Sequence, residues 1–272
     1  MDDGSHWAPT SSPCPRLRRV SELGWWWLRR GHLPSRLSSH FPAEYEMRSL
    51  RATVLEKLEP LHTLKSAREF AQVFFDILQI HRWLYEHPQI LHRDLSMANI
   101  MYRREDDKVY GALSDFDLSS FRDSMNDGPT SKHRTGTKPF MAFDLLNAGS
   151  EQLHRYRHDL KSLFYIILIY SSHYSDPTTR ASSLPFKLWL FVQLYFNNFT
   201  QWLAIIRRML DKGYKSLPST DDDYLPEEEQ LLADLYDWDT LDVNFTYTKV
   251  MDVMRFFGGR ELVTRWNGER RD

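Results

Sequence analysis

The stretch "ILHRDLSMANIMYRR", Ile90 to Arg104, decides the fold of this chain. It contains H-R-D-L-x-x-x-N in full, with Asp94 third in the pattern and Asn99 closing it. The apolar residues that follow Asn99 predict a short strand. The pattern therefore places a carboxylate and an amide on one loop, directly ahead of a strand.

A second acidic motif, "SDFDLS", follows at a workable distance and begins with Ser114 and Asp115. The residues between the two motifs predict two short strands, "IMYRR" and "VYGALSDF", joined by the charged turn Glu105–Lys108. Such a hairpin can fold back and bring Asp94 and Asp115 to one cleft. The alternative is a hairpin whose Asp and Asn side chains only cap turns.

These residues suit phosphoryl transfer, which needs positioned phosphates, metal ions that offset charge and a carboxylate that orients the incoming hydroxyl. Asp94 suits the last of these tasks. Asn99 and Asp115 offer oxygen atoms, which Mg²⁺ prefers as ligands. The residues alone therefore predict a phosphotransferase centre.

The full pattern, the D-F-D at Asp115 and the later Gly136-Thr137 and "FMAFD" resemble a protein kinase. More narrowly, "VLEKLEPL", "FAQVFFDILQIHRWLYEHPQILHRDLSMANIMYRR" and "RHDLKSLFYIILIY" resemble the fungal-type protein kinase family, closely over about residues 51–170. The resemblance implies an α+β, mostly helical fold with a protein-kinase-like C-terminal lobe. It also implies ATP and Mg²⁺ as cofactors, and serine or threonine hydroxyls of proteins as acceptors.

The resemblance implies roles for individual residues. The residues expected at the catalytic centre are His92, Arg93, Asp94 and Thr137. Those expected to bind the cofactor are Glu56, Leu58, Asn99 and Asp115, of which the last two would be the metal ligands. Asp94 would be the catalytic base, with Thr137 near it, and Glu56 to Leu58 would form the hinge beside adenine.

Two further residues have roles that the resemblance implies. Arg93 would meet a phosphate on a hydroxyl of the loop at about 118–140, for example on Thr130, Ser131 or Thr135. Asp159 would begin a buried helix and anchor the backbone of the His92–Arg93 turn. Without the resemblance, Asp159 would be interpreted as an ordinary helix N-cap.

The chain departs from the usual kinase pattern at two positions. Asp117 replaces the glycine of D-F-G, and Ala142-Phe143-Asp144 stands where A-P-E is expected. The first change removes a flexible glycine, and the second keeps the acid one carbon shorter and loses the proline.

The motifs of an N-terminal kinase lobe are not found ahead of Asp94. No G-x-G occurs there, and no lysine precedes Lys57, which itself falls in the hinge motif. We therefore expect a weakly structured leader at 1–45 and a kinase-like domain at 46–272 that lacks most of the N-terminal lobe. Within it we expect a hinge strand at about 51–58, catalytic and activation segments at 90–144, and a helical remainder at 145–272.

Periodicity and caps predict the helices. Ser66 and Glu69 have the form of a capping box, and Phe70, Phe74, Ile77, His81 and Leu84 recur at helical spacing up to the stop before Pro88. A buried helix should begin near Asp159, followed by a loop at 171–186. Further helices are expected at about 187–212, 227–236 and 246–257, the last ended by Gly258-Gly259.

Composition narrows the class of partner and compartment. The formal net charge is -2, so nucleic acid is not an expected partner, and Cys14 is the only cysteine, which fits a reducing compartment. The longest apolar run, Leu163–Tyr170, is far below the roughly 18 residues of a membrane span. We expect an intracellular protein, cytoplasmic or nuclear, whose partners are protein substrates or other proteins, without a membrane.

Three functions compete at this point. The first is a serine/threonine protein kinase, impaired by the lack of the phosphate-binding lysine and glycine-rich loop. The second is a catalytically inactive pseudokinase or kinase fragment that binds proteins. The third, a small-molecule phosphotransferase, is favoured by D-x-D at Asp115 and Asp117 but disfavoured by Arg93, which suits a phosphorylated loop.

The first prediction concerns nucleotide affinity. We expect the purified chain to bind ATP-Mg²⁺ weakly or not at all, because a kinase grips the phosphates with a lysine and a glycine-rich loop that this sequence lacks before Lys57. Calorimetry with ATP and Mg²⁺ measures the affinity directly. Micromolar binding would contradict the expectation and would mean that the segment ahead of Lys57 contacts the nucleotide in another way.

Overall fold

The helix α2, Ala67–Glu86, packs against both strands and helices of the described fold. Ser66 caps it as the sequence predicts, because its hydroxyl accepts a hydrogen bond from the Glu69 amide at 3.2 Å. The apolar face predicted from helical spacing is buried along its whole length. Asp76 and Gln79 are also buried, so α2 contacts other elements on more than one face.

The computed structural model describes residues 57–122, 136–146, 153–182, 191–218 and 234–265. All of these except Lys57 belong to one unit, Leu58–Asp272. Several predictions concern other residues: the leader at 1–45, Glu56 with most of the hinge strand, the hydroxyls of Thr130, Ser131 and Thr135, and most of the helix at 227–236. They lie outside the described residues and stay predictions.

The stretch that carries the H-R-D-L-x-x-x-N motif, residues 92–99, is the predicted catalytic loop. The two predicted strands after the catalytic loop form a hairpin. Strand β3, Ile100–Glu105, pairs antiparallel with β4, Lys108–Leu113, and the two residues between them make the turn. The short strand β1, Glu59–Pro60, pairs with the other edge of β3, which gives the order β1-β3-β4. Strand β1 lies directly after the predicted hinge strand.

Helices make up the rest of the described fold. These are α3, Phe143–Leu146; α4, Tyr156–His173; α5, Thr200–Lys215; and α7, Tyr247–Met254. Short 3-10 turns are η1, Leu61–Thr63; η3, Lys138–Phe140; and η4, Leu194–Phe199. Two small sheets complete it: β2, Ile90–Leu91, with β5, Ser120–Phe121; and β6, Phe256–Phe257, with β7, Arg260–Glu261.

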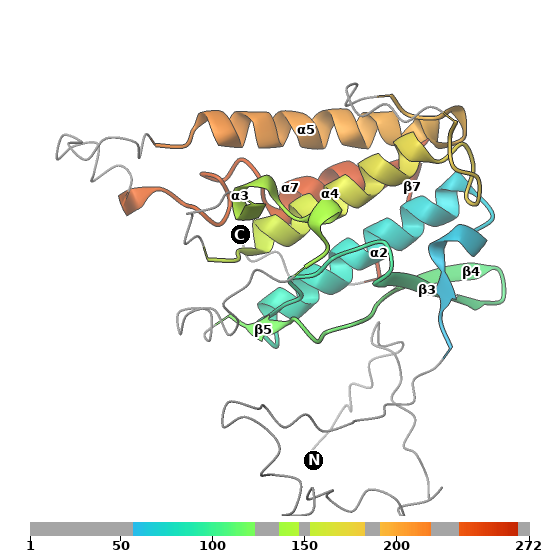
Figure 1. The fold of residues 1–272 in the computed structure, drawn as a ribbon, viewed down its shortest axis with the longest axis horizontal. Coiled ribbons are helices and arrows are strands. Elements are labelled where there is room, and N and C mark those ends of the chain that lie inside the picture. The colour runs from blue at the N-terminus through green and yellow to red at the C-terminus, as the bar shows by residue number, and fades with distance from the viewer. Residues whose placement is uncertain (1–56, 123–135, 147–152, 183–190, 219–233, 266–272) are drawn as a thin grey trace, which may run out of the picture. The chain divides into compact units, whose positions relative to one another are not determined.

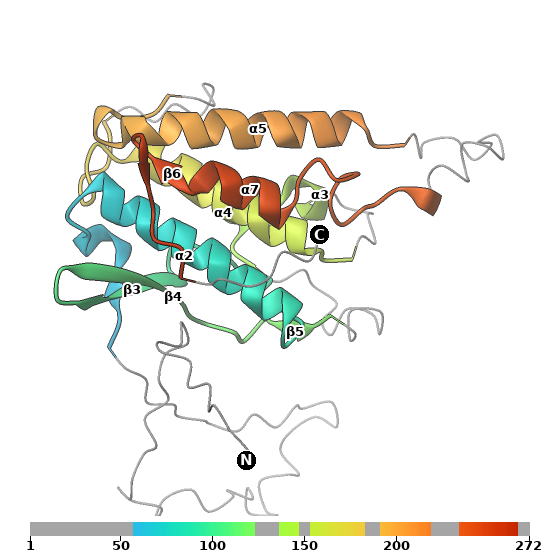
Figure 2. The same ribbon diagram turned by 180° about the vertical axis from the view of Figure 1, so that it is seen from behind.

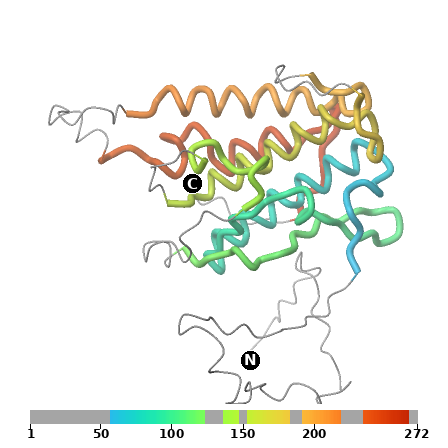
Figure 3. The backbone as a smooth tube through the Cα atoms, in the orientation of Figure 1, coloured from blue at the N-terminus to red at the C-terminus, as the bar shows by residue number. Residues whose placement is uncertain are grey.

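These elements stack in layers. Figures 1 and 2 show α4 and α7 between α5 and α2, with the β3–β4 hairpin on the other side of α2. The tube in Figure 3 traces the same order along the chain. Aromatic rings from α2, η4 and α5 meet at one end of the core, where Phe74, Phe199 and Trp202 pack edge to face. The prediction of a mixed fold with more helix than strand is confirmed.

The structure corrects three of the predicted boundaries. Helix α4 continues to His173, so the first residues of the predicted loop at 171–186 are helical. The predicted helix at 187–212 is a 3-10 turn at Leu194–Phe199 followed by α5, which reaches Lys215. Helix α7 ends at Met254, and Gly258 and Gly259, both with positive φ, form the turn of the β6–β7 hairpin rather than a helix end.

A buried acid joins α2 to the hairpin and to the C-terminal segment. Asp76 is 3% exposed and accepts a hydrogen bond from the amide of Gly111 at 2.9 Å. A side chain at Gly111 would meet Asp76 Cβ and the Val73 carbonyl at 2.8 Å, so only glycine allows this approach. The Arg265 guanidinium lies 3.2 Å from Asp76 and donates to the carbonyl of Val109 at 2.7 Å.

The second prediction tests this contact. Arg265→Met should lower the free energy of unfolding by about 2 kcal/mol or more, because it leaves the carboxylate of Asp76 buried without its cation. The matched control is Arg207→Met, which removes the exposed Arg207–Asp211 pair and should change stability by about 0.5 kcal/mol or less. Urea denaturation of both variants measures the difference, and equal losses would contradict the assignment.

Candidate active site

The catalytic loop lies between two antiparallel strand pairs. Strand β2 ends just before His92 and pairs with β5, while β3 begins just after Asn99 and pairs with β4. Chain segments on both sides of the loop are therefore held by ladder hydrogen bonds. This arrangement fixes the two ends of the loop. The polar side chains between them form hydrogen bonds within the loop.

Asp94 is held by the segment that begins at Gly136, directly after residues 123–135, which lie outside the described residues. One of its carboxylate oxygens, Oδ1, accepts hydrogen bonds from the Thr137 amide at 2.8 Å and from the Thr137 hydroxyl at 2.9 Å. Gly136 has φ 136°, a backbone conformation that residues with a side chain rarely adopt. Gly136 therefore allows Thr137 to approach Asp94.

Asn99 links Asp94 to the start of the second motif. Its amide nitrogen donates to the Asp94 carbonyl at 2.9 Å and to Asp94 Oδ2 at 3.3 Å. Its own carbonyl accepts from the amide of Ser114 at 2.9 Å, which continues the β3–β4 ladder by one residue. Asp115 is therefore the next residue after the one that pairs with Asn99, as the hairpin predicts.

His92 also connects Asp94 to Ser114, at the start of the second motif. Its Nδ1 accepts from the Asp94 amide at 3.3 Å, so its Nε2 carries the proton and donates to the Ser114 carbonyl at 2.9 Å. The ring also packs edge-on against Phe116 at 4.8 Å between centroids. Burial lowers the pKa of His92, which keeps the ring neutral and preserves this pattern of donors and acceptors.

The backbone is strained at two site residues. Arg93 has φ 70° and Asp115 has φ 60°, in the left-handed region that L residues other than glycine seldom adopt. Such a conformation costs about 1–3 kcal/mol and persists only where surrounding contacts hold it. Strain of this kind clusters at functional sites, and here it occurs once in each of the two motifs.

Asp159 supplies the contact that holds Arg93. Its Oδ2 accepts from the Arg93 amide at 3.1 Å and from His81 Nε2 at 2.8 Å, and its Oδ1 accepts from His154 Nε2 at 2.7 Å. Burial alone would raise the pKa of Asp159, but the charge and hydrogen bond of His154 and the hydrogen bond of His81 hold it well below its usual range. Asp159 therefore anchors the His92–Arg93 turn, and the helix N-cap is Arg155 instead.

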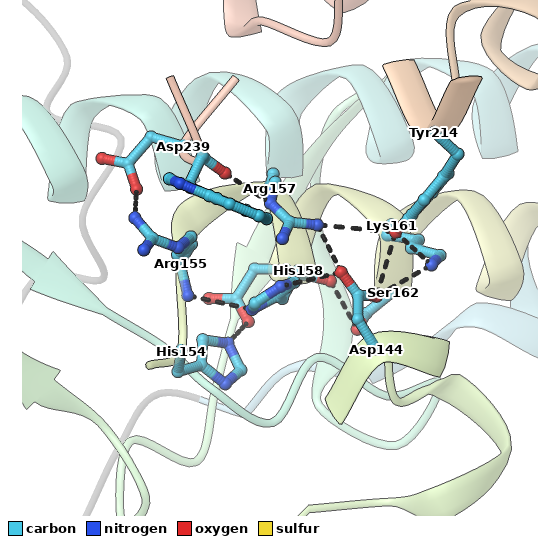
Figure 4. A network of polar contacts seen from close by, with 11 residues as sticks. Asp144, His154, Arg155, Arg157, His158, Lys161, Ser162, Tyr214 and Asp239 are labelled. Carbon is cyan, nitrogen blue, oxygen red and sulfur yellow. Dashed lines mark hydrogen bonds and ion pairs between the residues drawn. The ribbon is translucent and has the colours of Figure 1, made fainter. Parts of the chain in front are cut away.

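A second acid, on α3, is held by side chains of α4 and α5 (Figure 4). Asp144, at the position of the A-P-E acid, accepts hydrogen bonds from four side chains. They are those of Arg157, His158, Lys161 and Tyr214. Burial would raise the pKa of Asp144, but the His158 hydrogen bond and the charges of Lys161 and Arg157 hold it below its usual range. The shorter acid is therefore fully satisfied without the usual proline.

Asn99 and Asp115 offer oxygen atoms, the type of ligand that Mg²⁺ prefers. Because the side-chain nitrogen of Asn99 donates hydrogen bonds to Asp94, its side-chain oxygen is the atom that remains as an acceptor. Asp115 is exposed, and its carboxylate accepts only a long bond of 3.4 Å, from the Asp117 amide, among the described residues. No group of three or more His, Cys, Asp or Glu side chains in the described ranges could hold a metal alone. A magnesium ion here would therefore need further oxygens, such as those of phosphates.

The structure brings most of the predicted residues together. Hydrogen bonds join His92, Asn99 and Thr137 to Asp94. Arg93 precedes Asp94 and donates to Asp159 instead, and Asp115 follows Ser114, which pairs with Asn99. Leu58 is different. Strand β1 pairs Glu59 with Tyr102, so Leu58 lies further along β3, away from Asn99. The roles of all these residues stay predictions, as does that of Glu56.

Sequence reasoning missed the residues that support the loop from a distance. They are His81 and His154 around Asp159, and Arg157, His158, Lys161 and Tyr214 around Asp144. One signal was present. Arg157 and Lys161 are basic residues in a helix that is otherwise apolar on nearly every side, and a buried cation needs an anionic partner.

These contacts connect the loop that carries the H-R-D-L-x-x-x-N motif to Asp159 on α4, as the resemblance to a protein kinase predicts. The fungal protein kinase family matches residues 9–170, more than half of the 272 residues, and the chain belongs to this family. No curated protein matches the chain. Within the ranges that the structure covers, no helix combines the length and apolar character that a membrane span requires.

The third prediction concerns stability at low pH. Burial lowers the pKa of His158 to about 3. Between about pH 6.5 and 3, therefore, His158 is protonated in the unfolded chain but neutral in the folded chain. The free energy of unfolding should therefore fall as the pH is lowered through this range, by roughly 1.4 kcal/mol per unit for this group. His158→Gln keeps a donor for Asp144 but does not titrate, so its pH slope should be shallower by about one proton.

Denaturation curves at pH 7, 6 and 5 give the two slopes. The window lies above pH 4, where Asp144 and Asp159 stay ionised in both states or titrate little, so histidines dominate the difference. His92, whose pKa is also lowered, contributes equally to both proteins. Identical slopes in the two proteins would show that His158 is not the neutral, buried donor described above.

Proposed function

We propose that the chain is a protein kinase of fungal type that transfers the terminal phosphoryl group of ATP to serine or threonine hydroxyls of proteins. The observation that carries the proposal is the hydrogen-bonded cluster in which Thr137 and Asn99 fix the Asp94 carboxylate. Membership of the fungal protein kinase family supports it. The acceptor type, ATP and Mg²⁺ are parts of the proposal.

The two oxygens of Asp94 suit different tasks. Oδ1 accepts two short hydrogen bonds from Thr137, whereas Oδ2 accepts a single, longer bond from Asn99. Oδ2 therefore keeps more acceptor capacity for the hydroxyl of an incoming substrate. In the proposed reaction it orients that hydroxyl and takes its proton as the new oxygen–phosphorus bond forms and ADP leaves.

The proposed metal ligands are the Asn99 amide oxygen and the Asp115 carboxylate. A magnesium ion held there would offset the charge on the phosphates of ATP. The left-handed backbone at Asp115 turns the chain directly after Ser114, whose carbonyl is held by His92. His92 would thus be a positioning residue for Asp115, acting through the backbone of Ser114.

A non-catalytic protein-binding module is the second candidate. One observation favours it, namely that Asp117 stands where the flexible glycine of D-F-G is expected. The two candidates differ in a single measurable property. The first transfers phosphate from ATP to an acceptor, and the second does not.

The fourth prediction tests the first candidate. With radiolabelled ATP, Mg²⁺ and a serine- and threonine-rich acceptor protein, any transfer should fall about 10²-fold or more in Asp94→Ala, which loses the proposed base. Asp115→Ala, which loses a proposed metal ligand, should fall similarly. Asp107→Ala in the exposed hairpin turn is the matched control and should retain the activity of the original protein.

Each outcome of this experiment decides between the candidates. Loss in both site variants with retention in the control supports the kinase. Equal transfer in all proteins would assign the activity to another site or to a contaminant. If the original protein transfers no label while remaining folded, the non-catalytic module is the better description.

A further inference from the structure

A closed ring of contacts passes through Asp94. It starts with Thr137, which donates two hydrogen bonds to Asp94. The chain then turns through η3, where the Phe140 amide donates to the Thr137 carbonyl at 2.9 Å, and enters α3. Only a few residues therefore separate Thr137 from Asp144, and they are internally hydrogen-bonded.

Helix α4 closes the ring. Arg157 and Lys161 bind Asp144 from positions on either side of Asp159 along the helix. Asp159 holds the amide of Arg93, the residue directly before Asp94. One rigid helix thus fixes both the turn that precedes Asp94 and the segment whose threonine binds the Asp94 carboxylate.

The environment of Asp144 contains more positive charge than it needs. Arg157 alone would neutralise the carboxylate, yet Lys161, which is only 5% exposed, also places its Nζ 3.0 Å from it. Lys161 donates to the Tyr214 hydroxyl at 2.6 Å, and that hydroxyl donates to Asp144 at 2.9 Å. Tyr214 belongs to α5, so this pair fastens the ring to a second helix (Figure 4).

Burying a second cation is costly, so its presence calls for a role beyond neutralising Asp144. Lys161 and Tyr214 both bind Oδ1 of Asp144, whereas Arg157 binds Oδ2. We propose that Lys161 and Tyr214 are positioning residues for Asp94: by fixing Asp144 they hold Thr137 where it binds the Asp94 carboxylate. The proposal rests on the proposed function in one respect, the catalytic role of Asp94.

The test measures hydrogen exchange at the Thr137 amide by NMR, which needs neither ATP nor an acceptor. Tyr214→Phe removes the hydroxyl that lies between Lys161 and Asp144. We expect exchange of the Thr137 amide to become on the order of tenfold faster, because its partner segment opens more often. Lys161→Met should have an effect in the same direction.

Tyr170→Phe is the matched control. Tyr170 also belongs to the buried region, on α4, and its hydroxyl donates to the Pro177 carbonyl at 2.8 Å, at the other end of the helix. Its loss should leave the Thr137 amide unchanged. An equal increase in the control, or faster exchange at Leu145 without any change at Thr137, would overturn the proposal, because the network would then stabilise only the fold or only α3.

A double-mutant cycle gives a second, independent readout. Thr137→Val removes one of the two bonds to Asp94, and no hydrogen bond or ion pair joins Thr137 to Tyr214 directly. If the ring is real, the unfolding equilibrium constant of the double variant with Tyr214→Phe should differ several-fold from the product of the single effects. With Tyr170→Phe it should agree within about twofold, and agreement in both cycles would contradict the ring.

These readouts separate the proposal from the proposed function. If the chain transfers no phosphate but shows the expected exchange and coupling, the proposal for the ring stands and only the kinase assignment is contradicted. A chain that transfers phosphate through Asp94 but shows neither effect would retain the kinase assignment and lose the ring.

Discussion

The fully buried carboxylate of Asp159 is the constraint on which the site depends. An ionised acid without exposure to water is tolerable only when charges and hydrogen bonds surround it, and Asp159 has partners from α2, the catalytic loop and the segment before α4. Each partner is thereby fixed relative to the others. The left-handed conformation of Arg93 persists because its amide donates a hydrogen bond to Asp159. The position of Asp94 follows from that of Arg93.

Local chemistry made the hairpin and α2 predictable. The spacing of apolar residues, the Ser66 cap and the charged turn all act over a few residues, so a single sequence displays them. The residues proposed for the site on the loop could also be singled out from the sequence, because one motif contains them all, and their roles stay predictions. The end of α7 was mispredicted because two adjacent glycines can serve a hairpin turn as readily as a helix end.

Contacts between distant residues were not predictable in the same way. Asp144 meets Tyr214 and His81 meets Asp159 only after the helices have packed, and no periodicity announces such pairs. The capping box shows the limit even at short range. Glu69 was expected to reach back to Ser66, but its carboxylate binds the amide of Lys65 and the guanidinium of Arg104 instead. Tertiary partners decided which local option was used.

The salt contact of Arg265 with Asp76 has a consequence for the order of events during synthesis. The two residues are 189 positions apart in the sequence, so α2 emerges from the ribosome long before the cation that neutralises its buried acid. Until then, packing α2 against the hairpin would bury an uncompensated charge. The contact between α2 and the hairpin is therefore disfavoured in the nascent chain until Arg265 has emerged from the ribosome.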